Sequence, residues 1–243
     1  MYQLTPAGDA PQYDADAEVR FAEDWPEFIF HDAEVAKYRE RRVSYFPEWE
    51  FYYTADERLI AGCWGVPIAW DATVPDLPGG FTDTLARSVT EHEKKVVPNT
   101  FVLMAAAVRS DEQGQGHAGR VITAVRDHAT ANGLPQVIAP VRPTLKSSYP
   151  LTPIETFMTW TRDDGLPLDP WLRTHVRLGA TLLAPAPASQ TMTGSVADWE
   201  KWTNMQFPST GTYTIPAGLT TLAIDREADT GLYIEPNIWL RHA

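Results

Sequence analysis

The feature that most constrains the fold is an apolar run followed by a glycine-rich loop, a helical pattern and a second apolar run. Residues 100–108, "TFVLMAAAV", form a continuous apolar segment with polar neighbours, which is typical of a strand buried on both faces. The loop "RSDEQGQGHAG" follows, and the helical pattern after it ends at Asn132-Gly133, a favourable C-terminal cap. Residues 135–141, "PQVIAPV", are the next apolar run. This order predicts a parallel strand–helix–strand crossover.

The glycine loop has to be compared with several phosphate-binding patterns. Gly114, Gly116 and Gly119 have the G-x-G-x-x-G spacing of a dinucleotide-binding loop. However, five polar residues precede Gly114, and the next strand ends in Val141-Arg142 without the acid that would hold a ribose. Arg142 could instead contact a 2′-phosphate, which keeps an NADP-dependent oxidoreductase as a third choice. A P-loop is excluded because the stretch has no Gly-Lys-Ser/Thr.

The same loop contains Gln113-x-x-Gly116-x-Ala118, which resembles the acetyl-coenzyme A signature of the GNAT acyltransferase superfamily, Arg/Gln-x-x-Gly-x-Gly/Ala. In such a loop, backbone N–H groups converge on the pyrophosphate and the following helix adds the positive end of its dipole. Small residues are expected because a larger side chain would block that approach. The resemblance also implies that the end of the strand before the loop pairs with the pantetheine arm. The residues that it assigns to coenzyme A are Ala106, Ala107, Val108, Gln113, Gly114, Gln115, Gly116, His117, Ala118 and Gly119.

The order of the elements expected between residues 28 and 184 is similar to that family as well. We therefore expect an α/β (α+β) fold, a GNAT-like mixed twisted sheet with flanking helices, splayed parallel strands around the coenzyme A loop and a β-rich C-terminal extension. The other elements that we expect are a strand at 28–31, a helix at 32–42, a hairpin of 48–54 and 58–70, a helix at 81–95, a helix that begins at Pro170, a helix capped by Ser195 and two strands within 219–242, the second of which completes the main sheet.

The chain is longer than a minimal member of the family needs. We expect a flexible tail at 1–16 and a single GNAT-like domain at 17–243, with insertions at 71–98 and 142–168 and a C-terminal extension at 185–243. Long segments beside a parallel-strand opening are commonly binding loops. The two insertions are therefore predicted to build the acceptor or acyl pocket, and their aromatic content indicates an apolar or bulky partner.

The proton donor of the reaction is one candidate for a catalytic role. The family has a tyrosine, credited with protonating the departing thiolate, four residues before a glycine, and the resemblance places His175 in that position before Gly179. A histidine can donate a proton near neutral pH. Tyr149 is the nearest alternative phenol in the sequence.

The general base is less clearly marked. Neither residues 100–108 nor 135–141 contain an acidic residue, although the family often draws its base from those strands. Glu50, beside tyrosines on the expected hairpin, is one candidate. Glu155 is another, but "TPIE" at 152–155 also fits a helix capping box.

The resemblance implies an N-acetyltransferase that acts by direct transfer in a ternary complex, with acetyl-CoA or another acyl-CoA as co-substrate and no metal. Because the usual tyrosine and a strand-borne base are missing, a non-catalytic protein that binds or senses acyl-CoA is the alternative. The formal net charge of −12 argues against a nucleic-acid partner. An acidic surface is typical of simple solubility and also attracts a cationic acceptor, while the aromatic insertions indicate an aromatic one. A single cysteine, Cys63, and the lack of a signal segment or apolar membrane span predict a cytoplasmic protein. A homodimer is left open.

Overall fold

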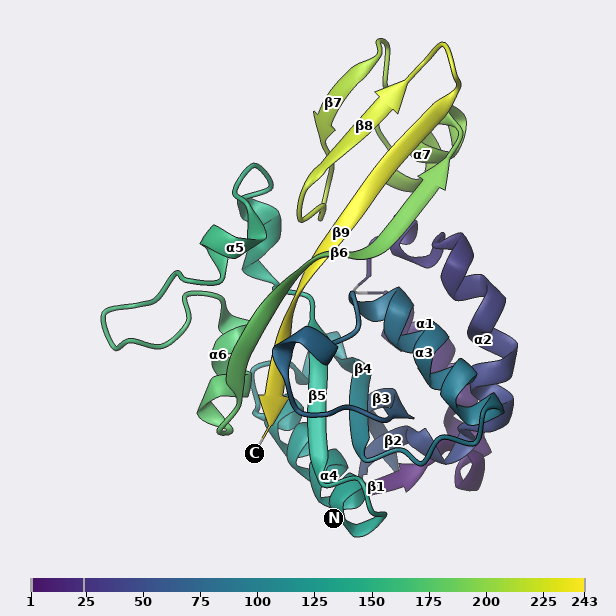
Figure 1. Cartoon of the computed structure of the whole chain (residues 1–243), viewed down its shortest axis with the longest axis vertical. Coiled ribbons are helices and arrows are strands. Elements are labelled where there is room, and N and C mark those ends of the chain that lie inside the picture. Colours follow the sequence, from purple (N-terminus) through teal and green to yellow (C-terminus); the bar gives the residue numbers. More distant parts are fainter. Residues whose placement is uncertain (1, 24, 243) are drawn as a thin grey trace.

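The computed structural model describes residues 2–23 and 25–242, and one large sheet runs through this part of the chain (Figure 1). Its strands lie in the order β1-β2-β3-β4-β5-β9-β8-β7, and β6 pairs with β9. The described strands are β1 (Tyr2–Pro6), β2 (Glu50–Ala55), β3 (Arg58–Ile68), β4 (Thr100–Val108), β5 (Gln136–Val141), β6 (Thr181–Gly194), β7 (Gly211–Thr214), β8 (Thr221–Asp225) and β9 (Thr230–His242). Only β4 and β5 pair in parallel, so the sheet is mixed, as predicted.

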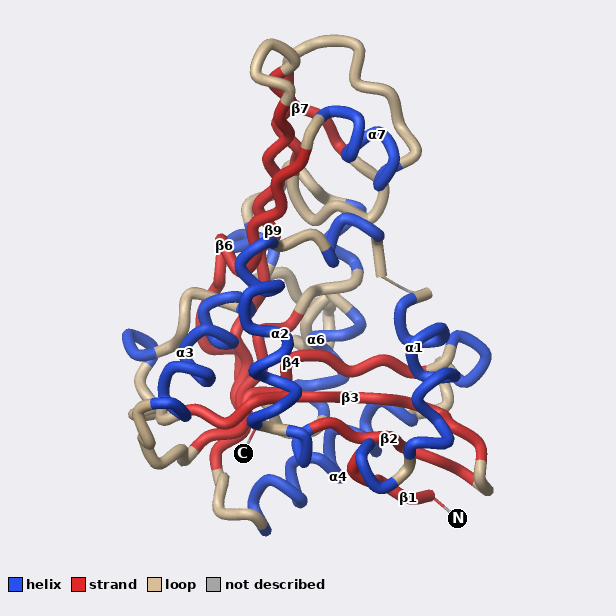
Figure 2. Tube along the Cα trace, turned by 90° about the vertical axis from the view of Figure 1, so that its right-hand side faces the viewer, coloured by secondary structure: helices blue, strands red, loops and turns tan. Residues whose placement is uncertain are grey.

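Helices flank this sheet, and all but α7 lie outside the projection at the top of Figure 1. They are α1 (Asp14–Ala22), α2 (Ala33–Tyr45), α3 (Phe81–Glu93), α4 (His117–Ala131), α5 (Ile154–Phe157), α6 (Pro170–Arg177) and α7 (Val196–Thr203). Helix α2 packs along α3, while α4 runs beneath β3, β4 and β5 (Figure 2). None of the described helices has the length and apolar character needed to cross a lipid bilayer.

Three helix starts follow the chemistry that the sequence indicates. The side chain of Asp32 accepts hydrogen bonds from two N–H groups of α2, and Asp169 does the same for α6, in which Pro170 is the first residue. Ser195 and Asp198 form a reciprocal capping box at α7. A fourth expectation was wrong: Glu155 belongs to no capping box, because α5 begins after Pro153, which provides no side-chain acceptor.

The hairpin β2–β3 was predicted correctly, and β3 contains a bulge. A register shift lies between Trp64 and Gly65, where β3 pairs with β4. A Cβ atom at Gly65 would lie only 2.2 Å from the carbonyl oxygen of Val102, so the close approach of these two strands requires glycine.

Two predictions near the N-terminus were wrong. Within the expected flexible tail 1–16, residue 1 lies outside the described part, but β1 pairs with β2 and the Tyr52 hydroxyl donates to Asp14 across 2.8 Å. The expected strand at 28–31 is a 3-10 helix, Glu27–Phe30. Its Phe28 and Ile29 side chains are buried in a different part of the protein, which explains why this apolar run does not join the sheet.

That other part is a projection at the top of Figure 1, which we call the distal lobe and define as residues 190–235. It contains the upper halves of β6 and β9 together with α7, β7 and β8. Its own apolar core comprises Phe28, Ile29, Met192, Val196, Trp199, Phe207, Ile215, Leu222, Ile224 and Tyr233. The last strand, β9, links both regions, because it pairs with β8 in the lobe and with β5 in the main sheet. The predicted C-terminal strand pair is thereby confirmed.

Candidate functional site

The candidate site begins where the two parallel strands separate. Strands β4 and β5 pair only from Thr100 to Val102, opposite Gln136 to Ile138. Beyond that point β4 continues to Val108 along β3, and β5 continues along β9. Residues 105–108 are accordingly only half-buried, whereas 100–104 are buried. The unpaired edge of β4 can therefore accept an extended ligand as an additional strand.

The glycine loop follows directly at the end of β4. Gly114 and Gly116 have φ angles of +78° and +79°, the left-handed region that glycine adopts most easily. A Cβ atom on either residue would meet no protein atom within 4 Å. Inside the protein, then, it is backbone conformation rather than lack of space that calls for glycine here.

Helix α4 starts from this loop with unsatisfied donors. Its N-cap is Gly116, which makes no side-chain capping bond, and the first backbone bond of the helix runs from Arg120 N to the Gly116 carbonyl. The N–H groups of His117, Ala118 and Gly119 therefore have no partner within the helix. Gln113 folds back so that its Nε2 donates to the Val108 carbonyl at 3.3 Å, which holds the loop against β4. This arrangement suits an anion such as a pyrophosphate.

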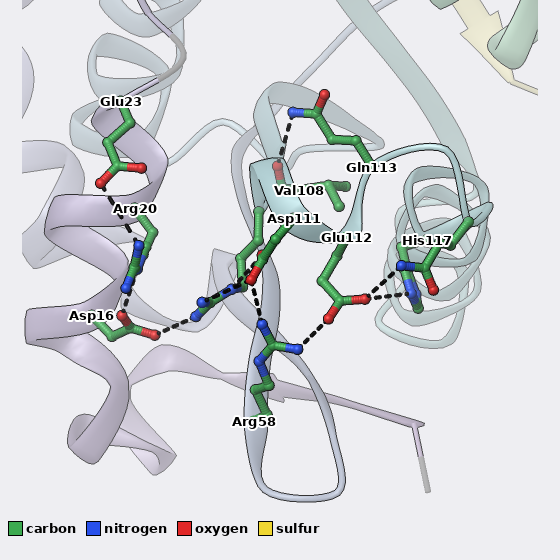
Figure 3. Close-up of polar contacts among 11 residues, drawn as sticks. Asp16, Arg20, Glu23, Arg58, Val108, Asp111, Glu112, Gln113 and His117 are labelled. Carbon is green, nitrogen blue, oxygen red and sulfur yellow. Dashed lines mark hydrogen bonds and ion pairs between the residues drawn. The ribbon is translucent and has the colours of Figure 1, made fainter.

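Acidic residues next to the loop are neutralised by arginines (Figure 3). Arg58 binds Asp111 at 2.5 Å and also Glu112. Arg109 donates to Asp111 and to Asp16, each at 3.1 Å. The hydrogen bond from Arg109 is the main reason why the pKa of the Asp111 carboxyl lies below its usual range. These ion pairs keep two carboxylates from repelling a nearby anion.

The His117 side chain points back into the protein rather than toward a ligand. Only 3% of the residue is exposed, its ring lies against Tyr2 and Tyr53, and its Nε2 is 3.6 Å from Glu112. Its Nδ1 has no hydrogen-bond partner among the described residues. The coenzyme A assignment of His117 therefore concerns its backbone N–H.

His175 lies on α6, fully buried. Its Nδ1 is 2.9 Å from Nε2 of His242 at the end of β9. Burial lowers the pKa of His175 to about 3 and that of His242 to about 4, so both rings are neutral at physiological pH. Nε2 of His175 has no partner among the described residues. Because a neutral imidazole has no readily released proton, a role for His175 has to rest on hydrogen bonding; its assignment as proton donor stays a prediction.

Helix α6 nevertheless lies beside the glycine loop. A Cβ atom on Gly119 would be 3.7 Å from a Leu178 methyl group, directly after α6. The helix ends in a Schellman motif, in which Ala180 N donates to the His175 carbonyl and Gly179, at φ +88°, donates to Val176. His175 is three residues before Leu178 and shares its side of the helix.

Tyr149 and Glu50 lie in separate places. The Tyr149 ring is 40% exposed and packs edge-on against Trp160 at 4.9 Å. Glu50 accepts a hydrogen bond from Arg42 at 2.6 Å and stands opposite Trp64 on β3. No hydrogen bond or ring contact among the described residues joins His175, Tyr149 and Glu50. Each role stays a prediction.

The insertion at 71–98 forms helix α3, and its histidine lies away from the strand opening. His92 stacks on Tyr45 at 4.3 Å, and Glu93 accepts from Arg41 at 3.0 Å. A cavity of about 220 Å³ in this region is lined by Tyr45, Phe46, Glu48, Trp49, Pro67, Ser88, Glu91, His92, Val96, Pro98, Asn132 and Leu134. Pro98 and Leu134 precede β4 and β5, so this cavity lies at the end of the strands opposite the opening.

A network of charged residues, which the sequence did not predict, lies where β5 ends. Glu235 on β9 is fully buried and accepts hydrogen bonds from Arg142 Nε and the Tyr233 hydroxyl. Lys146 donates to the carbonyls of Tyr149, at 2.8 Å, and Leu219. Burial raises the pKa of the Glu235 carboxyl, while Arg142 opposes that shift. Nothing in the sequence pattern of β9 indicates that an acid occupies a core position.

Neither a metal centre nor a reactive thiol is found within residues 2–23 and 25–242. No three His, Cys, Asp or Glu side chains there are arranged to hold a metal ion. Cys63 is buried in β3, and burial raises the pKa of its thiol, which makes it a poor nucleophile.

Comparison of the sequence and the fold with those of known proteins shows what the chain resembles. No family model matches the chain. It is 27% identical over 247 residues to an arginine N-acetyltransferase of Aspergillus versicolor, with 90% of this chain and 84% of that protein covered. The whole chain superimposes on the loading GNAT-like domain of CurA from Lyngbya majuscula, with a TM-score of 0.56, 15% identity and 97% of that domain covered. It also superimposes on the GphF GNAT-like decarboxylase in complex with isobutyryl-CoA, with a TM-score of 0.57, 15% identity and 98% of that chain covered. The chain is therefore similar in sequence to an N-acetyltransferase and has the fold of GNAT-like proteins.

Proposed function

We propose that the protein is an acyl-CoA-dependent N-acetyltransferase that transfers an acetyl group directly from acetyl-CoA to a nitrogen of a small cationic acceptor. The observation that carries this proposal is the opening between β4 and β5 beside a loop with two left-handed glycines and unsatisfied helix N–H groups. The named activity of the Aspergillus relative supports it.

The chain's backbone performs most of the binding of coenzyme A in this proposal. The first N–H groups of α4 and the turn at Gly114 and Gly116 hold the pyrophosphate. The free edge of β4 at residues 106–108 pairs with the amide groups of pantetheine. A backbone N–H of the same strand end then polarises the thioester carbonyl, because negative charge develops on that oxygen when the acceptor attacks.

The acceptor is a small amine or guanidine with positive charge. Its class is inferred from the relative, which is an arginine N-acetyltransferase, and from the net charge of −12, which attracts cations. Glu50 is our candidate for the general base, because its carboxylate could accept the acceptor's proton. His175 is our candidate for a neutral N–H donor to the departing sulfur, through its unpartnered Nε2.

The decisive experiment combines binding and turnover. Calorimetry with acetyl-CoA and with NADP, followed by release of free thiol in the presence of a panel of amines and guanidines, separates the functions considered. We expect acetyl-CoA to bind in the micromolar range and thiol release to require an acceptor. Binding without thiol release for any acceptor would favour the sensing protein, and binding of NADP alone would favour the oxidoreductase.

A further inference from the structure

The network at the end of β5 has an unusual balance of charge. Arg142 forms an ion pair with Glu235. The charge of Glu235 also acts on the Lys146 ammonium: burial lowers the pKa of that group, and Glu235 opposes the shift. Glu235 is 0% exposed and Lys146 only 1%. Among the described residues, this places two buried or half-buried cations around one carboxylate.

Two arginines elsewhere in the described part, Arg58 and Arg87, show the reverse pattern. Arg58 meets Asp111 and Glu112, and Arg87 meets Asp76 and Glu91. Each of these arginines has two carboxylates, which is what a chain with a net charge of −12 makes easy. An excess positive charge at a largely buried position is costly unless an anion compensates it.

One nitrogen of Arg142 is available for such an anion. Its Nε binds Glu235 and its Nη2 donates to the Ala217 carbonyl at 2.6 Å, whereas Nη1 makes no hydrogen bond with the described residues. The side chain is 17% exposed, and Ala217 is exposed. These two hydrogen bonds fix the plane of the guanidinium group. An anion can therefore bind at Nη1 without a further loss of side-chain conformational entropy.

The place of Arg142 connects this nitrogen to the candidate site. Arg142 directly follows Val141, the last residue of β5, and β5 is one of the two strands that separate to form the opening. The segment after it, with Lys146 and Tyr149, belongs to the insertion that we predict to contact the acceptor. Ala217 belongs to the distal lobe, so the Arg142 side chain joins the end of β5 to this lobe.

We propose that Arg142 binds the carboxylate of the acceptor, so that the acceptor is an amino acid with a free carboxyl group rather than a simple amine. This inference rests on the proposed function, because it assigns a substrate class to the same transferase site. Lys146 keeps its hydrogen bonds to the carbonyls of Tyr149 and Leu219, and its positive charge adds to the attraction of the acceptor's carboxylate. The acceptor's carboxylate is then held at the end of β5 while its nitrogen, after giving its proton to the base, reaches the thioester between the strands.

The first test compares three acceptors on the wild-type protein at saturating acetyl-CoA. L-arginine carries the carboxylate, L-arginine methyl ester masks it, and agmatine lacks it. We expect kcat/KM for L-arginine to exceed that for the other two by about 10- to 100-fold, the effect of one charge-assisted hydrogen bond. Equal or better turnover of the ester or agmatine would overturn the proposal.

The second test removes the cation without leaving a buried carboxylate unpaired. In the double variant Arg142→Gln/Glu235→Gln, we expect kcat/KM for L-arginine to fall by at least about 10-fold while the value for agmatine changes by less than about 3-fold. Arg226→Gln is the matched control, because Arg226 also donates to a lobe carbonyl and lies near a glutamate. Equal losses for both acceptors in the double variant would show that Arg142 acts only on structure.

Failure of this inference can be told apart from failure of the proposed function. If none of the three compounds is acetylated, calorimetric titration of the CoA-loaded protein with L-arginine and agmatine decides. Tighter binding of L-arginine, lost in the double variant, supports the carboxylate site even without turnover. Binding of neither compound, or of both equally, contradicts it, and acetyl-CoA binding measured in parallel reports separately on the transferase assignment.

Discussion

The opening between β4 and β5 has two walls, one beside each strand, and different kinds of chemical group form them. On the β4 side, backbone groups form the site: two left-handed glycines, the free strand edge and the N–H groups of α4. On the β5 side, buried side-chain charges do so, with Glu235 holding Arg142 in place. Under the proposed function, the β4 side binds a ligand common to many proteins through backbone groups, while the side chains of the β5 side can vary with the acceptor.

The largest expected effect concerns the β5 wall. Glu235→Gln leaves Arg142 and Lys146 without their counter-charge, and we expect the free energy of unfolding to fall by about 3–5 kcal/mol. Urea denaturation measures this loss. The double variant with Arg142→Gln should lose less than the sum of the single variants, because the two residues are in direct contact. A loss below about 1 kcal/mol for Glu235→Gln would mean that the network is not an electrostatic unit.

The buried histidine pair belongs to neither wall and is expected to make the fold sensitive to acid. The pKa values of His175 and His242, about 3 and about 4, lie below the ordinary value of 6.5. The unfolded chain therefore binds protons first, and stability falls as the pH falls below 6.5. We expect a loss of about 2–3 kcal/mol between pH 7.5 and 5.5, measured by denaturation at each pH.

Variants isolate the source of this pH dependence. His242→Gln should reduce the slope of stability against pH, because it removes one of the two histidines whose pKa is lowered by burial. A stability that stays constant between pH 7.5 and 5.5 would contradict burial of the pair.

The β4 wall can be tested with two glycines at opposite ends of the same helix. Gly116 and Gly133 have φ angles of +79° and +82°, and a Cβ atom on either would meet nothing within 4 Å. Replacement by alanine should therefore cost each about 1–2 kcal/mol of stability. Only Gly116→Ala should weaken acetyl-CoA binding, by about 10-fold, because it stands at the pyrophosphate. Equal affinities of the two variants in calorimetry would remove the loop from coenzyme A binding.

The smallest expected effect concerns the charges beside the loop. Arg58→Ala removes the arginine partner of Glu112 and leaves Asp111 with Arg109 alone. We expect acetyl-CoA affinity to fall about 2- to 5-fold at low salt, with less effect at 0.5 M salt. Stability should change by less than about 1 kcal/mol, because the Arg58 side chain is 47% exposed. Arg41→Ala, which breaks the exposed pair with Glu93 at the other end of the strands, is the control. An unchanged salt dependence would exclude electrostatic support of the loop.

The predictions from sequence succeeded where the cause is local. The crossover β4–α4–β5 followed from apolar runs and a glycine cap, and the caps at Asp32 and Asp169 followed from short-range hydrogen bonding. The predicted strand at 28–31 failed because an apolar run does not reveal which core it enters; Phe28 packs in the distal lobe. The predicted tail failed because β1 gains its order from β2, a partner distant in sequence.

The candidate site divides in the same way. Gln113, Gly116 and Ala118 could be read in order because a loop that surrounds a phosphate is one continuous segment. Arg142 was seen only as a candidate for a phosphate, since its partner Glu235 lies on a strand 93 residues later. His242, the partner of His175, lies 67 residues further along the chain and had no signal at all.

The sequence by itself determined the crossover β4–α4–β5, the glycine loop and the family that they resemble, because spacing and backbone propensity act over a few residues. The tertiary structure alone decided that His175 is neutral and buried, that His117 turns inward and that Arg142 keeps one nitrogen free. Burial and charge compensation depend on which distant segments pack together. The long final strand β9 places Glu235 beside Arg142 and His242 beside His175.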